Sequence, residues 1–218
     1  MANSSTQIVA VEGNIGVGKS TFIKFLNQYF PSSKTVAEPV DMWLNIKDIN
    51  GKNILQTFYD DIDRWAYTFQ NLAYVSRMIS IEQVIKNSDS KLFFLDRSLG
   101  TDKHVFEKML YNDNKLNHLE HQIYNIWCEF YSSYVRPNTD NKIIYLRCTP
   151  EVCKERINIR AREEEKNISL EYLEKLHKYH EEWLLEHNKV LIIECTRDFE
   201  NDIDYLEEIM NKVKNFLL

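Results

Sequence analysis

The chain has 218 residues, of which 44% are apolar, and a formal net charge of −6. This length suits one large α/β unit, and no linker-like, repetitive or low-complexity stretch divides it, so we expect residues 1–218 to form a single domain. The acidic balance is unfavourable for broad nucleic-acid binding, which requires clustered positive charge. The four cysteines form no C-x-x-C pair, which is atypical of a zinc site or a disulfide framework.

The sequence also gives no sign of membrane insertion or secretion. No apolar run approaches the roughly 20 residues that a membrane-spanning helix needs. The N-terminus, MANSSTQIVA, has neither the apolar core of a signal peptide nor the arginines of a transit segment. We therefore expect a cytoplasmic protein that binds small molecules rather than nucleic acids or membranes.

Short apolar runs alternate along the chain with longer amphipathic stretches. The runs predict buried parallel strands at 8–11, 34–39, 91–96, 142–147 and 189–194, and 34–39 has the weakest pattern. The amphipathic stretches predict helices at 19–30, 61–87, 115–135, 150–163, 169–188 and 199–217, with Pro31 ending the first and Asp198 as the N-cap of the last. This alternation predicts a doubly wound α/β fold in which ligands bind beyond the carboxyl ends of the strands.

The segment VEGNIGVGKST (11–21) follows the first predicted strand and opens the first helix. It fits the phosphate-loop pattern G-x-x-x-x-G-K-[ST] and has one additional glycine inside. Backbone N–H groups of such a loop wrap the phosphates of a nucleotide, and the helix N-terminus adds positive potential. The candidate phosphate-binding residues are Gly13, Asn14, Ile15, Gly16, Val17, Gly18, Lys19, Ser20 and Thr21. Among them, Lys19 would neutralise phosphate charge and the Ser20 hydroxyl would bind Mg²⁺.

Three charged residues lie at or just past the carboxyl ends of predicted strands, so the parallel topology should bring them to the phosphate loop. Glu38 stands just before a proline, which favours an extended backbone there, and it could accept a proton from an attacking hydroxyl. Asp96 could hold Mg²⁺ through water, and Arg97 could reach both the acceptor oxygen and the phosphate. The alternatives are an ordinary exposed glutamate at 38 and, at 96–98, a helix N-cap with a surface ion pair.

An arginine cluster lies in ERINIRAREEE (155–165), at the end of a predicted helix. Arg156 and Arg160 share a helix face, and Arg162 follows where the helical pattern breaks. Three arginines at a helix-to-loop junction, in a chain with a phosphate loop, favour a lid that closes over phosphates. The alternative is a solvated, salt-bridged face, because the same segment carries four glutamates.

One face of the helix predicted at 61–87 carries an amide, a small residue and a guanidinium. Gln70, Ala73 and Arg77 are spaced i, i+3 and i+7, and Trp65 and Phe69 lie on a neighbouring stripe. This face suits a planar base, because a glutamine amide can pair with the edge of a base as it does with adenine in DNA. The alternative is a helix whose aromatic residues belong only to the core.

Taken together, these residues resemble the deoxyribonucleoside kinases, a family that includes deoxycytidine, deoxyguanosine and mitochondrial thymidine kinases and the insect multisubstrate enzyme. The match runs in order along nearly the whole chain. The motifs that carry it are GNIGVGKST, EPVDMW, FYDDIDRWAYTFQ, DRS, IIYLRCTPEVCKERINIRAREEE, SLEYLEKLHKYHEEWL and VLIIECTRDFE. The resemblance implies a P-loop kinase fold, with a five-stranded parallel sheet flanked by helices and an Arg-rich lid, usually in a homodimer. It also implies that a single kinase domain transfers phosphate from ATP or another NTP, with Mg²⁺, to the 5′-hydroxyl of a deoxynucleoside in nucleotide salvage.

The resemblance further implies roles for individual residues. Glu38 is expected to accept the 5′-hydroxyl proton, with Arg97 beside it. Tyr59 and Glu165 are expected to bind the sugar 3′-hydroxyl, and Gln70 to read the base edge. The remaining expectations are Trp43, Phe58 and Phe69 as pocket walls, Arg160 and Arg162 as lid arginines, and Asp198 and Phe199 as the loop that touches the donor base.

The positions that line the base pocket in this family are occupied here by Ala73, Arg77 and Asp102, as in deoxycytidine and deoxyguanosine kinases. We therefore expect deoxycytidine or a purine deoxynucleoside to be preferred over thymidine.

Two positions depart from the family pattern. The animal enzymes usually have Glu at the position of Asp96, where Asp is familiar in bacterial purine deoxynucleoside kinases, and they often have Arg at the position of Asn158. The stretch 99–125 matches the animal enzymes poorly.

Two other classes of protein stay open from the sequence. A nucleoside monophosphate kinase, such as a thymidylate kinase, shares the phosphate loop, an acidic–Arg pair and a lid, but it needs a further cationic site for the phosphate of its acceptor. A GTP-binding switch would require an N-K-x-D guanine motif and a D-x-x-G after the third strand, and the chain has neither.

Overall fold

The computed structural model describes residues 6–135, 142–162, 165–195, 197 and 199–218. Within them, five strands form an all-parallel sheet in the order β2-β3-β1-β4-β5. The strands are β1 (Gln7–Glu12), β2 (Lys34–Val36), β3 (Leu92–Asp96), β4 (Lys142–Arg147) and β5 (Val190–Glu194). The central strand β1 is buried on both faces, as its continuous apolar run requires: Val9, Ala10 and Val11 are at most 1% exposed. The predicted five-stranded parallel sheet is confirmed.

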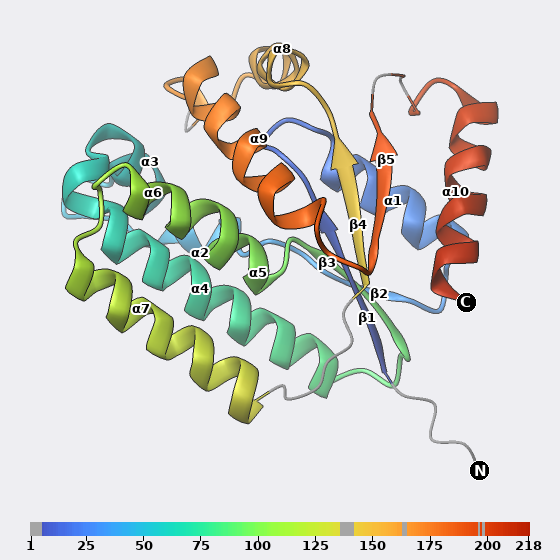
Figure 1. Ribbon diagram of the computed structural model, residues 1–218, viewed down its shortest axis with the longest axis horizontal. Helices are drawn as coiled ribbons and strands as arrows, with labels where there is room; N and C mark the ends of the chain where they lie inside the picture. The colour runs from blue at the N-terminus through green and yellow to red at the C-terminus, as the bar shows by residue number, and fades with distance from the viewer. Residues whose placement is uncertain (1–5, 136–141, 163–164, 196, 198) are drawn as a thin grey trace.

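Helices lie on both sides of the sheet (Figure 1). On one side lie α1 (Lys19–Tyr29) and α10 (Ile203–Leu217), and on the other α4 (Ile62–Lys86), α7 (His118–Phe130) and α9 (Leu170–Leu184). Helix α8 (Pro150–Arg160) crosses the carboxyl ends of the strands, at the top of Figure 1. The short elements are α2 (Val40–Asn45), α3 (Ile54–Asp60), α5 (Leu99–Thr101), α6 (Lys108–Asn112) and the π-helical segments η1 (Asp102–Glu107) and η2 (Tyr131–Val135).

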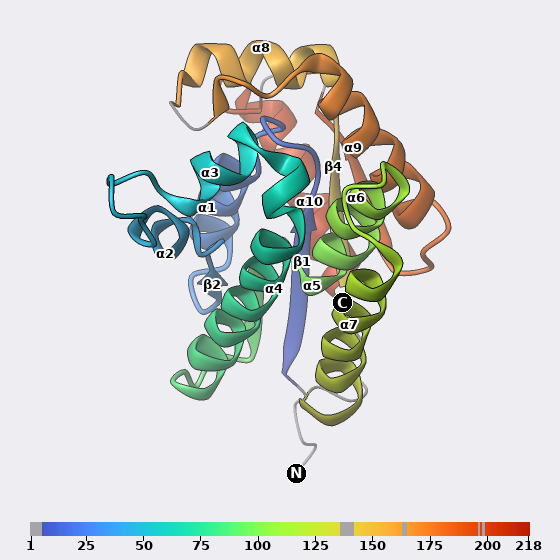
Figure 2. The same ribbon diagram turned by 90° about the vertical axis from the view of Figure 1, so that its left-hand side faces the viewer.

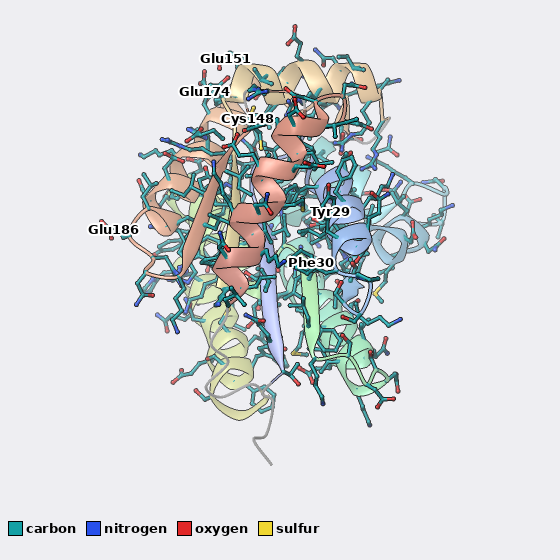
Figure 3. All side chains as sticks on the ribbon, turned by 90° about the vertical axis from the view of Figure 1, so that its right-hand side faces the viewer. Tyr29, Phe30, Cys148, Glu151, Glu174 and Glu186 are labelled. Atoms are coloured by element: carbon teal, nitrogen blue, oxygen red, sulfur yellow. The ribbon has the colours of Figure 1, made fainter. Side chains whose placement is uncertain are left out.

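Aromatic side chains hold these layers together. Figure 3 shows the side on which α10 lies, with Phe30 labelled directly after α1; its ring packs on Phe94 of β3 with centroids 5.7 Å apart. On the opposite side, α4 and α7 run side by side (Figures 1 and 2), and Tyr74 meets Tyr124 between them with centroids 5.5 Å apart. This packing fixes the frame from which the loops at the carboxyl ends of the strands project. Within the described ranges, the helices fall short of the length and apolar character that a bilayer crossing needs.

The last helix begins later than the sequence predicts. Instead of starting at 199, α10 starts at Ile203, and its N-cap is Asp202, whose carboxylate accepts a hydrogen bond from Tyr205 N at 3.0 Å. The residue predicted as the N-cap, Asp198, lies outside the described residues. The prediction of the start at 199 was wrong because Asp198 and Asp202 are both plausible caps and only one precedes the packed apolar face.

Smaller differences concern the ends of other elements. The strand predicted at 34–39 ends at Val36. The helix predicted at 150–163 ends at Arg160, because Ala161 takes a left-handed conformation with φ 50°. The helix predicted at 115–135 starts after Asn117, which forms a capping box, and its last turn is the π-helical η2.

Candidate active site

The phosphate loop connects β1 to α1 and packs closely against its surroundings. Gly13 and Gly16 have φ of 145° and 84°, in the region that favours glycine, and a Cβ on Gly13 would stand 2.6 Å from the Leu146 carbonyl oxygen. A Cβ on Gly16 would collide with the carbonyl of Cys153 in α8. The two glycines therefore allow the backbone of the loop to lie directly against β4 and α8.

Lys19 is held inside this loop. Its ammonium donates to the carbonyl oxygens of Gly13 at 3.0 Å and Asn14 at 2.9 Å, and the side chain is buried. Burial, followed by the charge of Arg97, lowers the pKa of Lys19 to about 8. The loop, with the described lid residues, borders a cavity of about 110 Å³. Its lining is Ile15, Gly16, Gly18, Lys19, Ser20, Thr21, Glu38, Asp96, Arg97, Arg160, Arg162 and Glu165.

The expected meeting of strand-end residues occurs around Glu38. Arg97 Nη1 donates to both carboxylate oxygens of Glu38, at 3.0 and 2.9 Å, and Arg77 Nη2 donates to Oε1 at 2.8 Å. Burial alone would raise the pKa of Glu38, but Arg97 and Arg77 lower it to about 2. Glu38 is therefore an ionised carboxylate gripped by two guanidinium groups, and the alternative of an ordinary exposed glutamate is wrong.

A second cavity of about 450 Å³ adjoins the first and contains most of the residues expected to bind the nucleoside. Its lining includes Glu38, Trp43, Phe58, Tyr59, Phe69, Gln70, Ala73, Arg77, Arg97, Asp102 and Glu165. The ring of Phe69 stacks on Phe58 with centroids 4.6 Å apart and meets Trp43 edge-on at 5.3 Å, so the three rings form one wall. Gln70 Oε1 is buried and has no hydrogen-bond partner among the described residues, which leaves an acceptor for a ligand.

Arg77 and Asp102 form a buried ion pair at this cavity. Both side chains are 2% exposed, and Arg77 Nε and Nη2 donate to the carboxylate at 2.7 and 3.4 Å. Arg77 Nη1 also donates to the Asp96 carbonyl at 3.0 Å. Burial raises the pKa of Asp102, and Arg77 opposes that rise. One guanidinium thus touches the base pocket, Glu38 and the end of β3.

Ser20 and Asp96 provide a donor set suited to Mg²⁺. Ser20 Oγ donates to Asp96 Oδ2 at 3.2 Å, which places a hydroxyl and a carboxylate together beside the phosphate loop. Asp96 Oδ1 is buried and unpartnered within the described part of the chain. Hard oxygen ligands of this kind, completed by phosphate and water, are those that Mg²⁺ prefers. The described residues contain no cluster of three or more His, Cys, Asp or Glu side chains suited to a metal.

The arginines of the predicted lid divide into two groups. Arg160 donates to Glu165 through Nε at 3.1 Å, and Arg162 Nη1 lies 3.6 Å from the same carboxylate. Arg156 instead donates to the main chain, to Val17 O at 2.9 Å and Cys195 O at 3.3 Å, and lies outside the described lining of both cavities. Arg160 and Arg162 therefore face the phosphate cavity, whereas Arg156 braces the loop itself.

The structure places Phe199 in the core rather than at a cavity. Its ring is 5% exposed and packs edge-on against Phe22 and Phe25, with centroids 5.8 and 6.3 Å apart. Its expected partner at the donor base, Asp198, lies outside the described residues. The donor-base role of both residues stays a prediction.

Some residues at or next to the site were not predicted individually from the sequence, among them Tyr172, Phe106 and Glu12. Tyr172 and Phe106 line the nucleoside cavity, and Tyr172 meets Tyr59 edge-on with centroids 6.4 Å apart. Glu12 is fully buried at the end of β1, and although burial raises its pKa, hydrogen bonds from Ser98 and Thr101 oppose the rise. Tyr172 stands in a motif that carries the resemblance, whereas Phe106 stands in the poorly matching stretch and Glu12 looks like an ordinary strand end.

Comparison with known proteins gives the family. The family model described as deoxynucleoside kinase matches residues 9–218. The chain is 35% identical to the deoxycytidine kinase of Homo sapiens, with 96% of this chain and 90% of the relative covered. It is 38% identical to the mitochondrial deoxyguanosine kinase of Xenopus laevis, with 99% and 92% covered, and 34% identical to a probable deoxycytidine kinase of fowlpox virus, with 96% and 87% covered. The phosphate loop, the gripped carboxylate and the aromatic-walled cavity therefore stand in a chain that belongs to the deoxynucleoside kinase family.

Proposed function

We propose that this deoxynucleoside kinase phosphorylates deoxycytidine or a purine deoxynucleoside in preference to thymidine, using ATP or another NTP with Mg²⁺ in nucleotide salvage. The observation that carries this preference is the buried Arg77–Asp102 pair beside the unpartnered Gln70 Oε1. A carboxylate at the base pocket accepts hydrogen bonds, so it favours a base edge that carries an amino group, as in cytosine, adenine and guanine. The corresponding position of thymine is a carbonyl oxygen next to a methyl group, which would face Asp102 without a hydrogen bond.

Glu38 supports the proposed chemistry as the acceptor of the 5′-hydroxyl proton. Phosphoryl transfer passes through a loose transition state, so the attacking hydroxyl becomes acidic late and a weak but well-placed base is sufficient. This suits a carboxylate with a pKa of about 2 that is held between Arg77 and Arg97. Arg97 also donates to the Gly13 carbonyl at 3.4 Å, so the same guanidinium contacts both the carboxylate of Glu38 and the phosphate loop.

Mg²⁺ would be held by Ser20 and Asp96, and it would supply charge neutralisation on the donor phosphates. Lys19 would leave the carbonyl oxygens of Gly13 and Asn14 and bind those phosphates. Arg160 and Arg162 border the same cavity and would bind equatorial oxygens from the lid. On the acceptor side, Tyr59 and Glu165 line the nucleoside cavity together, which supports their expected role at the sugar 3′-hydroxyl.

A homodimer is the second part of the proposal, and the exposed face of α7 supports it. Leu119, Ile123, Ile126 and Phe130 are between 45% and 69% exposed, and their 4-3-4 spacing is that of a helix–helix seam. A second copy of the chain would bury this face in a two-fold contact. Sedimentation velocity should show a dimer, and Ile126→Glu should convert it to a monomer. The matched control is Ile203→Glu on α10, which is 71% exposed and should leave the dimer intact.

One acceptor panel tests the catalytic proposal. Each of the four deoxynucleosides and each of their 5′-monophosphates is offered separately with ATP and Mg²⁺. We expect the deoxycytidine or purine deoxynucleosides to yield 5′-monophosphates with the highest kcat/KM. Phosphorylation of the monophosphates instead would favour a nucleoside monophosphate kinase, and a thymidine preference would refute the proposed base selection. The single-domain organisation and the cytoplasmic location stay predictions of the sequence.

A further inference from the structure

Glu12 has a buried carboxylate that, among the described residues, accepts hydrogen bonds from the segment that directly follows the neighbouring strand β3. It is the last residue of β1 and is 0% exposed. Its Oε1 accepts from Ser98 N at 2.8 Å and from Ser98 Oγ at 2.6 Å, and its Oε2 accepts from Thr101 Oγ1. Glu12 lies outside the described lining of both cavities, so its carboxylate is used inside the protein rather than toward a substrate.

The segment that Glu12 holds begins directly after Arg97, and the backbone of Arg97 is strained. Its φ is 66°, a left-handed conformation that costs energy for a residue with a side chain. On its N-terminal side, Arg97 N donates to Val11 O at 3.1 Å. On its C-terminal side, the restraint is the Glu12 carboxylate on Ser98. Two successive residues of β1 thus hold the two sides of this left-handed residue.

This backbone conformation decides where the Arg97 guanidinium points. In the structure it donates to both oxygens of Glu38 and approaches the Gly13 carbonyl. A return of Arg97 to negative φ would redirect its side chain and separate it from Glu38. The carboxylate of Glu12 therefore influences the position of the Arg97 guanidinium indirectly, through the main chain of residues 97 and 98.

We propose that Glu12 is a positioning residue for phosphoryl transfer: by binding Ser98 and Thr101 it holds Arg97 in the left-handed conformation that aims its guanidinium at Glu38. This rests on the proposed role of Arg97 beside the base. The main chain of Glu12 is independently fixed, because it pairs with Tyr145 of β4 in the sheet. Removing the side chain should therefore disturb the Ser98 segment more than the phosphate loop that starts at Gly13.

The test is a double-mutant cycle on kcat between positions 12 and 97. Glu12→Met keeps the length of the side chain but removes both acceptors, whereas Glu12→Gln keeps an acceptor for Ser98 and can donate to the Thr101 hydroxyl. Each is made in the parent and in the Arg97→Ala background. The readouts are kcat, the KM for ATP and for deoxycytidine, and the urea midpoint of unfolding, which separates a loss of folded protein from a loss of turnover.

We expect Glu12→Met to lower kcat by about 10- to 100-fold, since a misplacement of about 1 Å at the chemistry costs this much. The KM for ATP should change less than about threefold, and Glu12→Gln should recover most of the lost kcat, because the positioning depends on hydrogen bonds. In the Arg97→Ala background, Glu12→Met should lower kcat no further, although its effect on stability should persist.

The proposal is overturned if Glu12→Met keeps kcat within about threefold of the parent, or if it lowers kcat by the same factor in both backgrounds. A Glu12→Gln variant as slow as Glu12→Met would also overturn it. Arg97→Ala alone tests the proposed role of Arg97 in turnover, so a failure of that role is distinguished from a failure of the positioning role of Glu12. If Glu12→Met does not fold, Thr101→Val, which removes one donor at constant shape, should lower kcat several-fold only where Arg97 is present.

Discussion

Replacing Arg77 by Met together with Asp102 by Ala should raise kcat/KM for thymidine and lower it for the preferred deoxynucleoside. In the described part of the parent chain, Arg77 makes four hydrogen bonds, to Asp102, Glu38 and the Asp96 carbonyl, so it cannot move aside for a larger base edge. Excluding one methyl group from a rigid pocket accounts for about 10- to 200-fold in kcat/KM. The lost hydrogen bond to a charged group costs the preferred base about 1.5–3 kcal/mol, or roughly 10- to 150-fold.

The same contacts predict how the single and double variants differ in stability. Arg77→Met alone leaves Asp102, which is 1% exposed, as an unpaired buried carboxylate, and breaking a buried pair in this way costs about 3–5 kcal/mol. The double variant removes both charges, and Glu38 keeps its second partner, Arg97. The double variant should therefore unfold at a higher urea concentration than Arg77→Met alone.

Steady-state kinetics with all four deoxynucleosides, on the parent and the double variant, provide the measurement. Urea unfolding on the same preparations shows whether each variant is folded under assay conditions. If the parent already prefers thymidine, or if the ranking of the four substrates is the same in both proteins, Arg77 and Asp102 do not select the base.

Three further outcomes follow from the site. Glu38→Gln should lower kcat by about 10²–10⁴-fold with nucleoside binding nearly intact, and a variant that retains more than half the parent rate would show that Glu38 is not the base. If Tyr59 and Glu165 bind the 3′-hydroxyl, 2′,3′-dideoxynucleosides should be much poorer substrates than deoxynucleosides, because each unpaired buried group costs about 1–3 kcal/mol; equal kcat/KM for the two would contradict the assignment. Lys19 has a pKa of about 8, and bound phosphate should raise that pKa. As pH increases above 8, the free enzyme therefore loses the Lys19 proton before the ATP complex does, and the KM for ATP should rise while the KM for the nucleoside does not. A KM for ATP that stays constant between pH 7 and 9.5 would refute this role of Lys19.

The strands and the phosphate loop could be predicted because their signals are local. A parallel strand that is buried on both faces leaves a continuous apolar run, as in β1 and β4, and the loop needs glycines wherever its backbone approaches β4 and α8. Helices α2 and α3 were not predicted, because a helix of six or seven residues is stable only through its packing. The π-helical turn that carries Asp102 into the pocket leaves no recognised pattern in the sequence.

Site residues could be predicted where the sheet topology or a sequence motif determines their position. They could not be predicted where their position depends on contacts between segments far apart in the sequence. The convergence of Glu38, Asp96 and Arg97 follows from the parallel sheet. The resemblance placed Asp102 in the base pocket, but its complete burial with Arg77 depends on how α4 packs against η1. Glu12 gave no signal because its partners lie 86 and 89 positions away in the sequence.

The lid glutamate has a consequence for how the two substrates influence each other. In the structure, Glu165 pairs with Arg160 and Arg162 and also lines the nucleoside cavity. Donor phosphates that draw the two arginines away would free its oxygens for the sugar 3′-hydroxyl, and a bound sugar would in turn release the arginines. By linkage, each substrate would then strengthen the binding of the other by the same factor. The 3′-hydroxyl takes no part in the chemistry, yet it would strengthen the binding of the phosphate donor. An acceptor that lacks the 3′-hydroxyl would leave the affinity for the donor the same as in the enzyme without acceptor.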